Sequence, residues 1–177
     1  MKIRPWNLLF AVISSTCLAA ENTPIPLENS GFEQNLDGWT LQRGTASTTS
    51  EAAHEGSNGL RITASENATL SYPPIPIDGL KKYRLSIWVR GLENSHASVM
   101  LSFGDGSQKA MDIENANDFK KAITQGKDWK QISMDITPPE SASMLNFRLG
   151  VWPKKNAPAT DVIDVDGLSL EEVAGEP

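Results

Sequence analysis

The sequence predicts an all-β protein, a sandwich or barrel of short strands, on three observations. Apolar and polar residues alternate along most of the chain, Gly, Pro, Asn and Asp interrupt the alternation, and helical periodicity is nearly absent. An alternation of period two gives each strand one apolar face for a core and one polar face for solvent. Several such strands separated by turn residues are typical of a sandwich or barrel.

The first twenty residues are set apart from the fold. They begin with Lys2 and Arg4, continue as an apolar run and end in small residues. Such a run is too short to span a bilayer comfortably and has the pattern of a secretory signal, with cleavage expected after Ala19 or Ala20. We therefore expect residues 1–20 to be a cleaved signal peptide and the mature protein to be secreted or periplasmic.

The remaining chain, residues 21–177, has the size of a single domain with its own core. Removal of the signal removes Cys17, the only cysteine, so no disulfide or thiol chemistry is expected. The net charge of −6 argues against nucleic acid and anionic membranes as partners. No other segment is long and apolar enough to form a membrane span.

Six segments carry the alternation most clearly, namely 59–65, 83–91, 97–106, 129–138, 144–153 and 165–173. One face of each segment is apolar, and these faces predict the core. The predicted core residues are Leu60, Ile62, Tyr83, Leu85, Ile87, Val89, Val99, Leu101, Phe103, Ile132, Met134, Ile136, Leu145, Phe147, Leu149, Val151, Leu168 and Leu170. The one plausible helical piece is Asn115–Ile123, which is short enough to be a single turn inside a loop.

Five short stretches, taken in order, resemble a known family. They are "NSGFEQNLDGW" (29–39), "AAHEGSNGLRI" (52–62), "YRLSIWVRG" (83–91), "GKDWKQISMDITP" (126–138) and "VDGLSLEE" (165–172). In this order they resemble the carbohydrate-binding modules of families four, nine, sixteen and twenty-two. The resemblance implies a galactose-binding-like jelly roll, a β-sandwich of two antiparallel sheets. It indicates the fold more strongly than the ligand, because this fold hosts many functions.

The resemblance also implies a structural calcium ion. In modules of this type the ion is held by the acid after a Gly-Phe pair and by an Asp that opens the last strand, which here are Glu33 and Asp166. Calcium takes six to eight oxygen ligands, and the loop 54–59 would supply backbone carbonyls. Asp164 is a nearby substitute for a second acid that the family often has beside Asp166. The alternative is that Glu33 caps a loop and Asp166 is a solvated strand end.

Two of the strands carry a Trp on the face opposite their aliphatic side. Trp88 shares its face with Arg84 and Arg90, and Trp152 shares its face with Arg148. If both strands lie in one sheet, its outer face presents two indoles and up to three guanidinium groups. An indole stacks on a pyranose ring, and an Arg donates in a planar fork to hydroxyls or a carboxylate. The arginines further suggest an acidic glycan, such as a uronic-acid polymer.

Each of these side chains also has a structural alternative. A loop could cover Trp88, a turn could hold Trp152, and the arginines could be ordinary surface charges. Tyr72 could line one end of the site or pack against the rim of the sandwich. The framework aromatics, expected in the core, are Phe32, Trp39 and Trp129.

The sequence predicts no enzyme. It has no nucleophile elbow and no phosphate-binding loop, and His54 and His96 lie far apart without a second His or Cys at metal-ligand spacing. We therefore predict non-catalytic polysaccharide binding, either alone or beside a separate glycan-degrading enzyme. The alternative is a structural or adhesion domain that binds a protein or matrix partner, and a small glycan-active hydrolase or lyase is less favoured.

Overall fold

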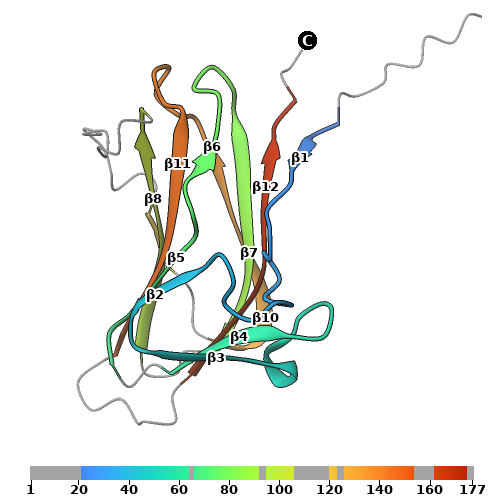
Figure 1. Cartoon of the computed structure of the whole chain (residues 1–177), viewed down its shortest axis with the longest axis vertical. Helices are drawn as coiled ribbons and strands as arrows, with labels where there is room; N and C mark the ends of the chain where they lie inside the picture. Colours follow the sequence, from blue (N-terminus) through green and yellow to red (C-terminus); the bar gives the residue numbers. More distant parts are fainter. Residues whose placement is uncertain are drawn as a thin grey trace, which may run out of the picture.

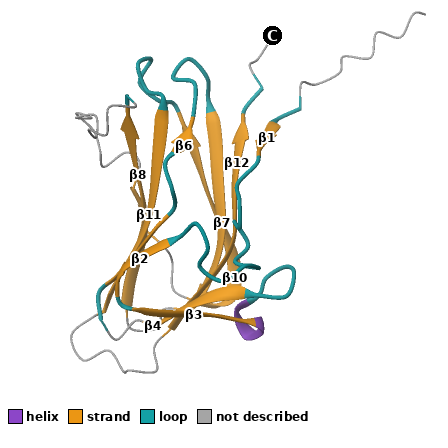
Figure 2. Ribbon diagram, viewed as in Figure 1, coloured by secondary structure: helices purple, strands orange, loops and turns teal. Residues whose placement is uncertain are grey.

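A computed structural model describes residues 21–63, 66–91, 95–105, 120–122, 126–153 and 162–174, which form two antiparallel β-sheets packed face to face (Figure 1). The only helical element in these ranges is the short 3₁₀ helix η1 (Ser50–Ala52), which follows β3 (Figure 2). The predicted β-sandwich is confirmed. Within the same ranges, no helix is long and apolar enough to cross a membrane.

The two sheets each contain six strands. Sheet A runs in the order β10–β7–β12–β4–β3, with β1 paired to β12, and sheet B runs in the order β2–β5–β11–β8–β9, with β6 paired to β11. The strands of sheet A are β1 (Thr23–Ile25), β3 (Thr45–Thr49), β4 (Gly59–Thr63), β7 (Tyr83–Gly91), β10 (Gly126–Ile136) and β12 (Val162–Glu172). Those of sheet B are β2 (Thr40–Arg43), β5 (Ala68–Ser71), β6 (Ile75–Pro76), β8 (Ser95–Gly104), β9 (Lys120–Ala122) and β11 (Met144–Pro153).

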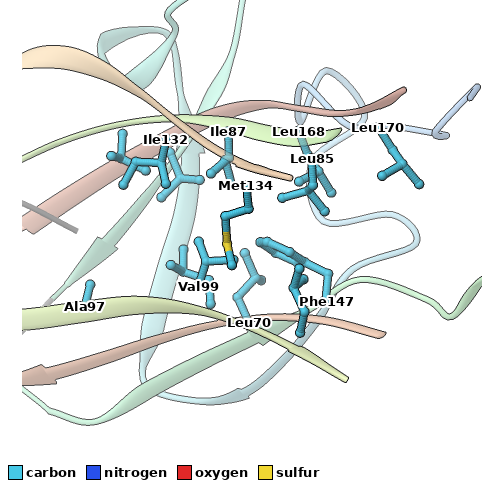
Figure 3. Packing of buried hydrophobic residues seen from close by; sticks show 14 of the residues in the cluster. Leu70, Leu85, Ile87, Ala97, Val99, Ile132, Met134, Phe147, Leu168 and Leu170 are labelled. Carbon is cyan, nitrogen blue, oxygen red and sulfur yellow. The ribbon is translucent and has the colours of Figure 1, made fainter. Parts of the chain in front are cut away.

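The core lies between the sheets and consists of alternate side chains from both. Figure 3 shows Leu85, Ile87 and Met134 of sheet A reaching toward Val99 and Phe147 of sheet B. All eighteen core residues predicted from the alternation are buried, which confirms the strand parity. Phe32 and Trp39 are buried as predicted, with ring centroids 4.7 Å apart.

Six of the strands were not predicted, namely β1, β2, β3, β5, β6 and β9. They have five residues or fewer, and several consist largely of Thr, Ser and Ala, so no apolar alternation marks them. Lys120–Ala122, within the candidate helix 115–123, forms β9, while the rest of that candidate lies outside the described residues. The predicted signal peptide also lies outside them.

The two tryptophan strands belong to different sheets. Trp88 lies on β7 of sheet A, and Trp152 lies on β11 of sheet B. Both side chains are on the outer side of their strand, because their neighbours along the strand, Val89 and Val151, are buried. The expectation of one outer face with two indoles is therefore wrong, and the predicted tryptophans and arginines divide between two opposite faces.

Candidate functional site

The outer face of sheet A is covered at Trp88 by the loop that follows η1. The imidazole of His54 stacks on the Trp88 indole, with ring centroids 3.9 Å apart and an angle of 16° between the planes. Trp129 meets the same imidazole edge-on at 5.2 Å. Trp129 is half-buried and lies in this outer cluster, so its predicted place in the core is wrong. One face of the Trp88 indole is thus occupied by the protein itself.

Arg90 and Asp164 belong to a buried ion network beside that stack. The two oxygens of Asp164 accept hydrogen bonds from Arg61 at 2.8 and 3.0 Å, and one of them also accepts from Arg90 at 2.9 Å. Arg90 further donates to the backbone carbonyl of Glu51 and lies 4.7 Å from the ring centroid of Trp129. Two arginines therefore neutralise Asp164, and its role as a substitute metal ligand stays a prediction.

The middle of the same face is an open polar groove of about 380 Å³. Ser86, Ser133 and Ser169 line it, and Arg84 at one end pairs with Asp135, with Nε to Oδ1 at 2.7 Å. That hydrogen bond raises the pKa of Arg84 above its usual value. No aromatic side chain lines the groove among the described residues. The groove itself therefore offers no indole on which a sugar ring could stack.

The outer face of sheet B has a different composition. A Cβ atom on Gly150 would collide with Cη2 and Cζ2 of the Trp152 indole and would lie 3.0 Å from the methyl carbon of Met100. The indole therefore lies across the strand at Gly150, beside Met100. Trp152 is half-buried, and the residue opposite it on the neighbouring strand β8 is the exposed His96. This placement suits an aromatic platform on the sheet, since glycine is the residue that leaves room for it.

Polar side chains surround this indole on the neighbouring strands. Arg148 is exposed on β11, with Ser71 of β5 opposite it in the ladder. Gln42 of β2 donates to the Ser71 hydroxyl at 3.4 Å, and Arg43 at the end of β2 is exposed. Gln42 and Arg43 were missed from the sequence because β2 carries no clear alternation. The face thus combines one indole with guanidinium, amide and hydroxyl groups.

Tyr72 lies at the rim of the sandwich and not on this face. Its ring packs edge-on against Trp39 at 4.8 Å, and its hydroxyl donates to the carbonyl of Glu28 at 2.7 Å. Burial is the main cause that raises the pKa of Tyr72. The structure therefore supports the predicted rim packing of Tyr72 over ligand contact.

Two carboxylates hold the loop 54–58 from both ends. Asp166, with 1% of its surface exposed, accepts from the backbone N–H groups of His54 at 2.7 Å and Glu55 at 3.0 Å. Glu33 Oε1 accepts from the N–H groups of Ser57 at 2.8 Å and Asn58 at 3.1 Å. The loop meets both acids with N–H groups, and the alternative that Asp166 is a solvated strand end is wrong.

These contacts also affect the ionisation of Glu33. The hydrogen bonds from the backbone of Asn58 and then of Ser57 lower its pKa from the usual 4.5. A lowered pKa in the folded state means that the carboxylate stabilises the fold above about pH 4.5 and loses this contribution as the pH falls further. Gly56, at a φ of +68°, lets the loop pass close to Glu33, where a Cβ atom would collide with the carboxylate.

The same two acids are the predicted calcium ligands. Glu33 Oε1 accepts from the backbone N–H groups of Ser57 and Asn58, and Asp166 Oδ1 accepts from the N–H of Gly167 at 2.8 Å. In the part of the chain that is described, no three His, Cys, Asp or Glu side chains gather to hold a metal. A calcium ion here would need several backbone carbonyls, as this cation accepts. The two acids could supply part of such a ligand set, although N–H groups of the loop 54–58 already donate to Glu33 Oε1 and Asp166 Oδ2.

Comparison with known proteins agrees with the fold. The family model of the carbohydrate binding domain matches residues 27–157, well over half of the chain. No curated protein sequence matches significantly. A family 16 carbohydrate-binding module superposes with a TM-score of 0.61 at 18% identity, covering 80% of this chain and 96% of that one.

Two further solved modules share the fold at low identity. One, solved with β-1,4-galactotriose, has a TM-score of 0.60 at 15% identity, covering 85% of this chain and 98% of that one. The other, the xylan-binding CBM22-1 domain of Paenibacillus barcinonensis Xyn10C, has a TM-score of 0.54 at 18% identity, covering 83% and 94%. On the match to its model, this chain belongs to the family of carbohydrate-binding domains.

Proposed function

We propose that the protein binds polysaccharide without cleaving it and that the outer face of sheet B is its binding face. The observation that carries the proposal is the Trp152 indole lying over Gly150. An indole that lies along the outer face of a sheet is the kind of side chain on which the apolar side of a pyranose stacks. Related modules of this fold were solved with a galactotriose or described as xylan-binding, so the fold accommodates different sugars.

The polar neighbours of Trp152 supply the other half of sugar recognition. Ser71, Gln42 and Arg148 lie on adjacent strands of the same face and can exchange hydrogen bonds with sugar hydroxyls. The outer face of sheet A is a poorer candidate, because His54 stacks on Trp88 and carboxylates bind Arg84 and Arg90.

The composition of the face also supports binding without catalysis. Glycoside hydrolysis ordinarily uses two carboxylates that flank the scissile bond. The strands of sheet B contain no Asp or Glu, so no described strand residue of this face could act as the acid or the nucleophile. We propose that the protein is exported and binds polysaccharide, either alone or beside a separate glycan-degrading enzyme.

Affinity electrophoresis against neutral and acidic polysaccharides tests the binding face. We expect Trp152→Ala to lose at least about 90% of the retardation, since stacking and burial of the indole together provide a tenfold or larger part of the affinity. The matched control is Trp88→Ala, a half-buried Trp on the opposite face, which should keep the retardation. Retardation lost in Trp88→Ala and kept in Trp152→Ala would place the site on sheet A, and a wild-type protein that no glycan retards would favour the adhesion function.

We further propose that Glu33 and Asp166 hold a structural calcium ion. Their convergence on the loop 54–58 supports this, because one ion could then tie that loop to the last strand. Chelation with EDTA should lower the melting temperature by several degrees, as expected when a ligand of the native state is withdrawn. Added calcium should restore it. A melting curve that neither chelator nor calcium moves would show that the backbone N–H bonds hold the loop without a metal.

A further inference from the structure

The two sheets differ in their acidic residues: the strands of sheet A mix acidic residues with the basic Arg61, Arg84, Arg90, Lys127 and Lys130. The strands of sheet A contain Asp128, Asp135, Asp164, Asp166, Glu171 and Glu172. The strands of sheet B contain no acidic residue, although the chain as a whole has a net charge of −6. Their charged residues are all basic, namely Arg43, Lys120, Lys121 and Arg148. Arg43 and Arg148, the charged residues of these strands whose side chains are described, are both cationic, and cationic groups attract ligands of the opposite sign.

The arginines of the two sheets also differ in their partners. Arg61, Arg84 and Arg90 of sheet A each form an ion pair with a carboxylate, at 2.7 to 2.9 Å. On sheet B, neither Arg43 nor Arg148 forms an ion pair or side-chain hydrogen bond with a described residue, and both are exposed. Their guanidinium groups therefore remain available to an anion, which a planar fork binds with two hydrogen bonds.

The two arginines, which have no ion-pair partner among the described residues, lie around the same indole. Arg43 is opposite Thr69 of β5, which is itself opposite Gly150 of β11, so Arg43 is level with the residue under the indole. Two strand spacings, roughly 10 Å, separate β2 from β11. Arg148 is four residues from Trp152 along β11, or roughly 13 Å. A chain of sugar rings lying on Trp152 thus passes within reach of two cationic groups.

We propose that the ligand is an acidic polysaccharide, whose anionic groups bind Arg43 and Arg148 while a ring stacks on Trp152. This inference rests on the proposed binding face. The anionic group is a uronic-acid carboxylate or a sulfate ester, since both offer oxygen pairs that match a guanidinium fork. An anionic sugar would have to displace no described carboxylate from Arg43 or Arg148, and the charge attraction favours it over a neutral sugar.

Isothermal titration with polygalacturonate and with its carboxyl-reduced galactan tests the inference, because the two polymers share one backbone and differ in charge. Dextran sulfate and dextran form a second pair that distinguishes sulfate from carboxylate. We expect at least about tenfold tighter binding of the charged member of one pair at about 20 mM NaCl, and most of this preference lost at about 500 mM. The double variant R43Q/R148Q should lose the same preference, whereas Arg84→Gln on sheet A should keep it.

Different outcomes would contradict the acidic ligand and the sheet B binding face, so the two proposals can be tested separately. Equal binding of charged and neutral polymers, abolished by Trp152→Ala, would overturn the acidic ligand and leave the binding face intact. A charge preference that R43Q/R148Q retains and Arg84→Gln loses would overturn the assignment of these arginines. A protein that binds none of the polymers at low salt would overturn the acidic ligand, and retardation on a neutral glycan would then still support the binding face.

Discussion

Replacement of Asp166 by Ala should lower the free energy of unfolding by about 3 to 5 kcal/mol. The carboxylate is buried and accepts three backbone N–H groups, from His54, Glu55 and Gly167. Its loss leaves these three part-buried donors without partners inside the protein, and each unsatisfied donor costs on the order of 1 kcal/mol or more. The melting temperature should fall by roughly 10 °C, which differential scanning calorimetry measures directly.

The matched control is Asp135→Ala on the same sheet. Asp135 is also a strand carboxylate with a short ion pair, but 71% of its side chain is exposed. Exposed pairs of this kind contribute less than about 1 kcal/mol. If the two variants melted within a degree or two of each other, Asp166 could not be the residue that fastens the loop 54–58.

Replacement of Gly150 by Ala should abolish polysaccharide binding while leaving the fold intact. The new methyl group would occupy the position of the Trp152 indole, so the ring must leave the sheet surface. Because the ring is the far end of a side chain at an outer face, the core residues on either side of Gly150, Leu149 and Val151, need not move. We expect retardation to fall at least about tenfold, as in Trp152→Ala.

Gly126→Ala on β10 is the matched control for this variant. Gly126 is also a strand glycine, but the nearest atom to its added Cβ is the flexible Nζ of Lys130, at 3.3 Å. Its binding should be unchanged. The double variant Gly150→Ala/Trp152→Ala should bind no worse than Trp152→Ala alone, because both changes remove the same contact. A further tenfold loss in the double variant would mean that Gly150 acts through something other than the indole.

Strand parity was the part of the fold that sequence reasoning recovered well. Each long strand alternates so regularly that its inner face can be listed residue by residue, and Leu85 and Phe147 are examples that the structure confirms. Parity says which side of a strand a residue occupies. It does not say which strands are neighbours, since that depends on pairing between segments distant in the chain. Trp88 and Trp152 were therefore both assigned correctly as outer residues and wrongly to one sheet.

The candidate site was only partly predictable for a related reason. Trp88 could be recognised as an outer aromatic, but its cover, His54, comes from a loop more than thirty residues earlier in the chain. Arg43 and Gln42 lie on a four-residue edge strand with no periodic signal. The room that Gly150 leaves for Trp152 is a property of side-chain packing. Such contacts appear only once the strands are paired and the loops are closed.

The most direct test of the central claim is nuclear magnetic resonance of the tryptophan indole N–H signals. The protein is titrated with oligosaccharides of the polymer that retards it most in affinity electrophoresis. Binding on the outer face of sheet B predicts that the Trp152 signal and the amides of β5, β8 and β11 shift together, with the Trp88 signal unmoved. Shifts confined to Trp88, β7 and β10 would contradict it.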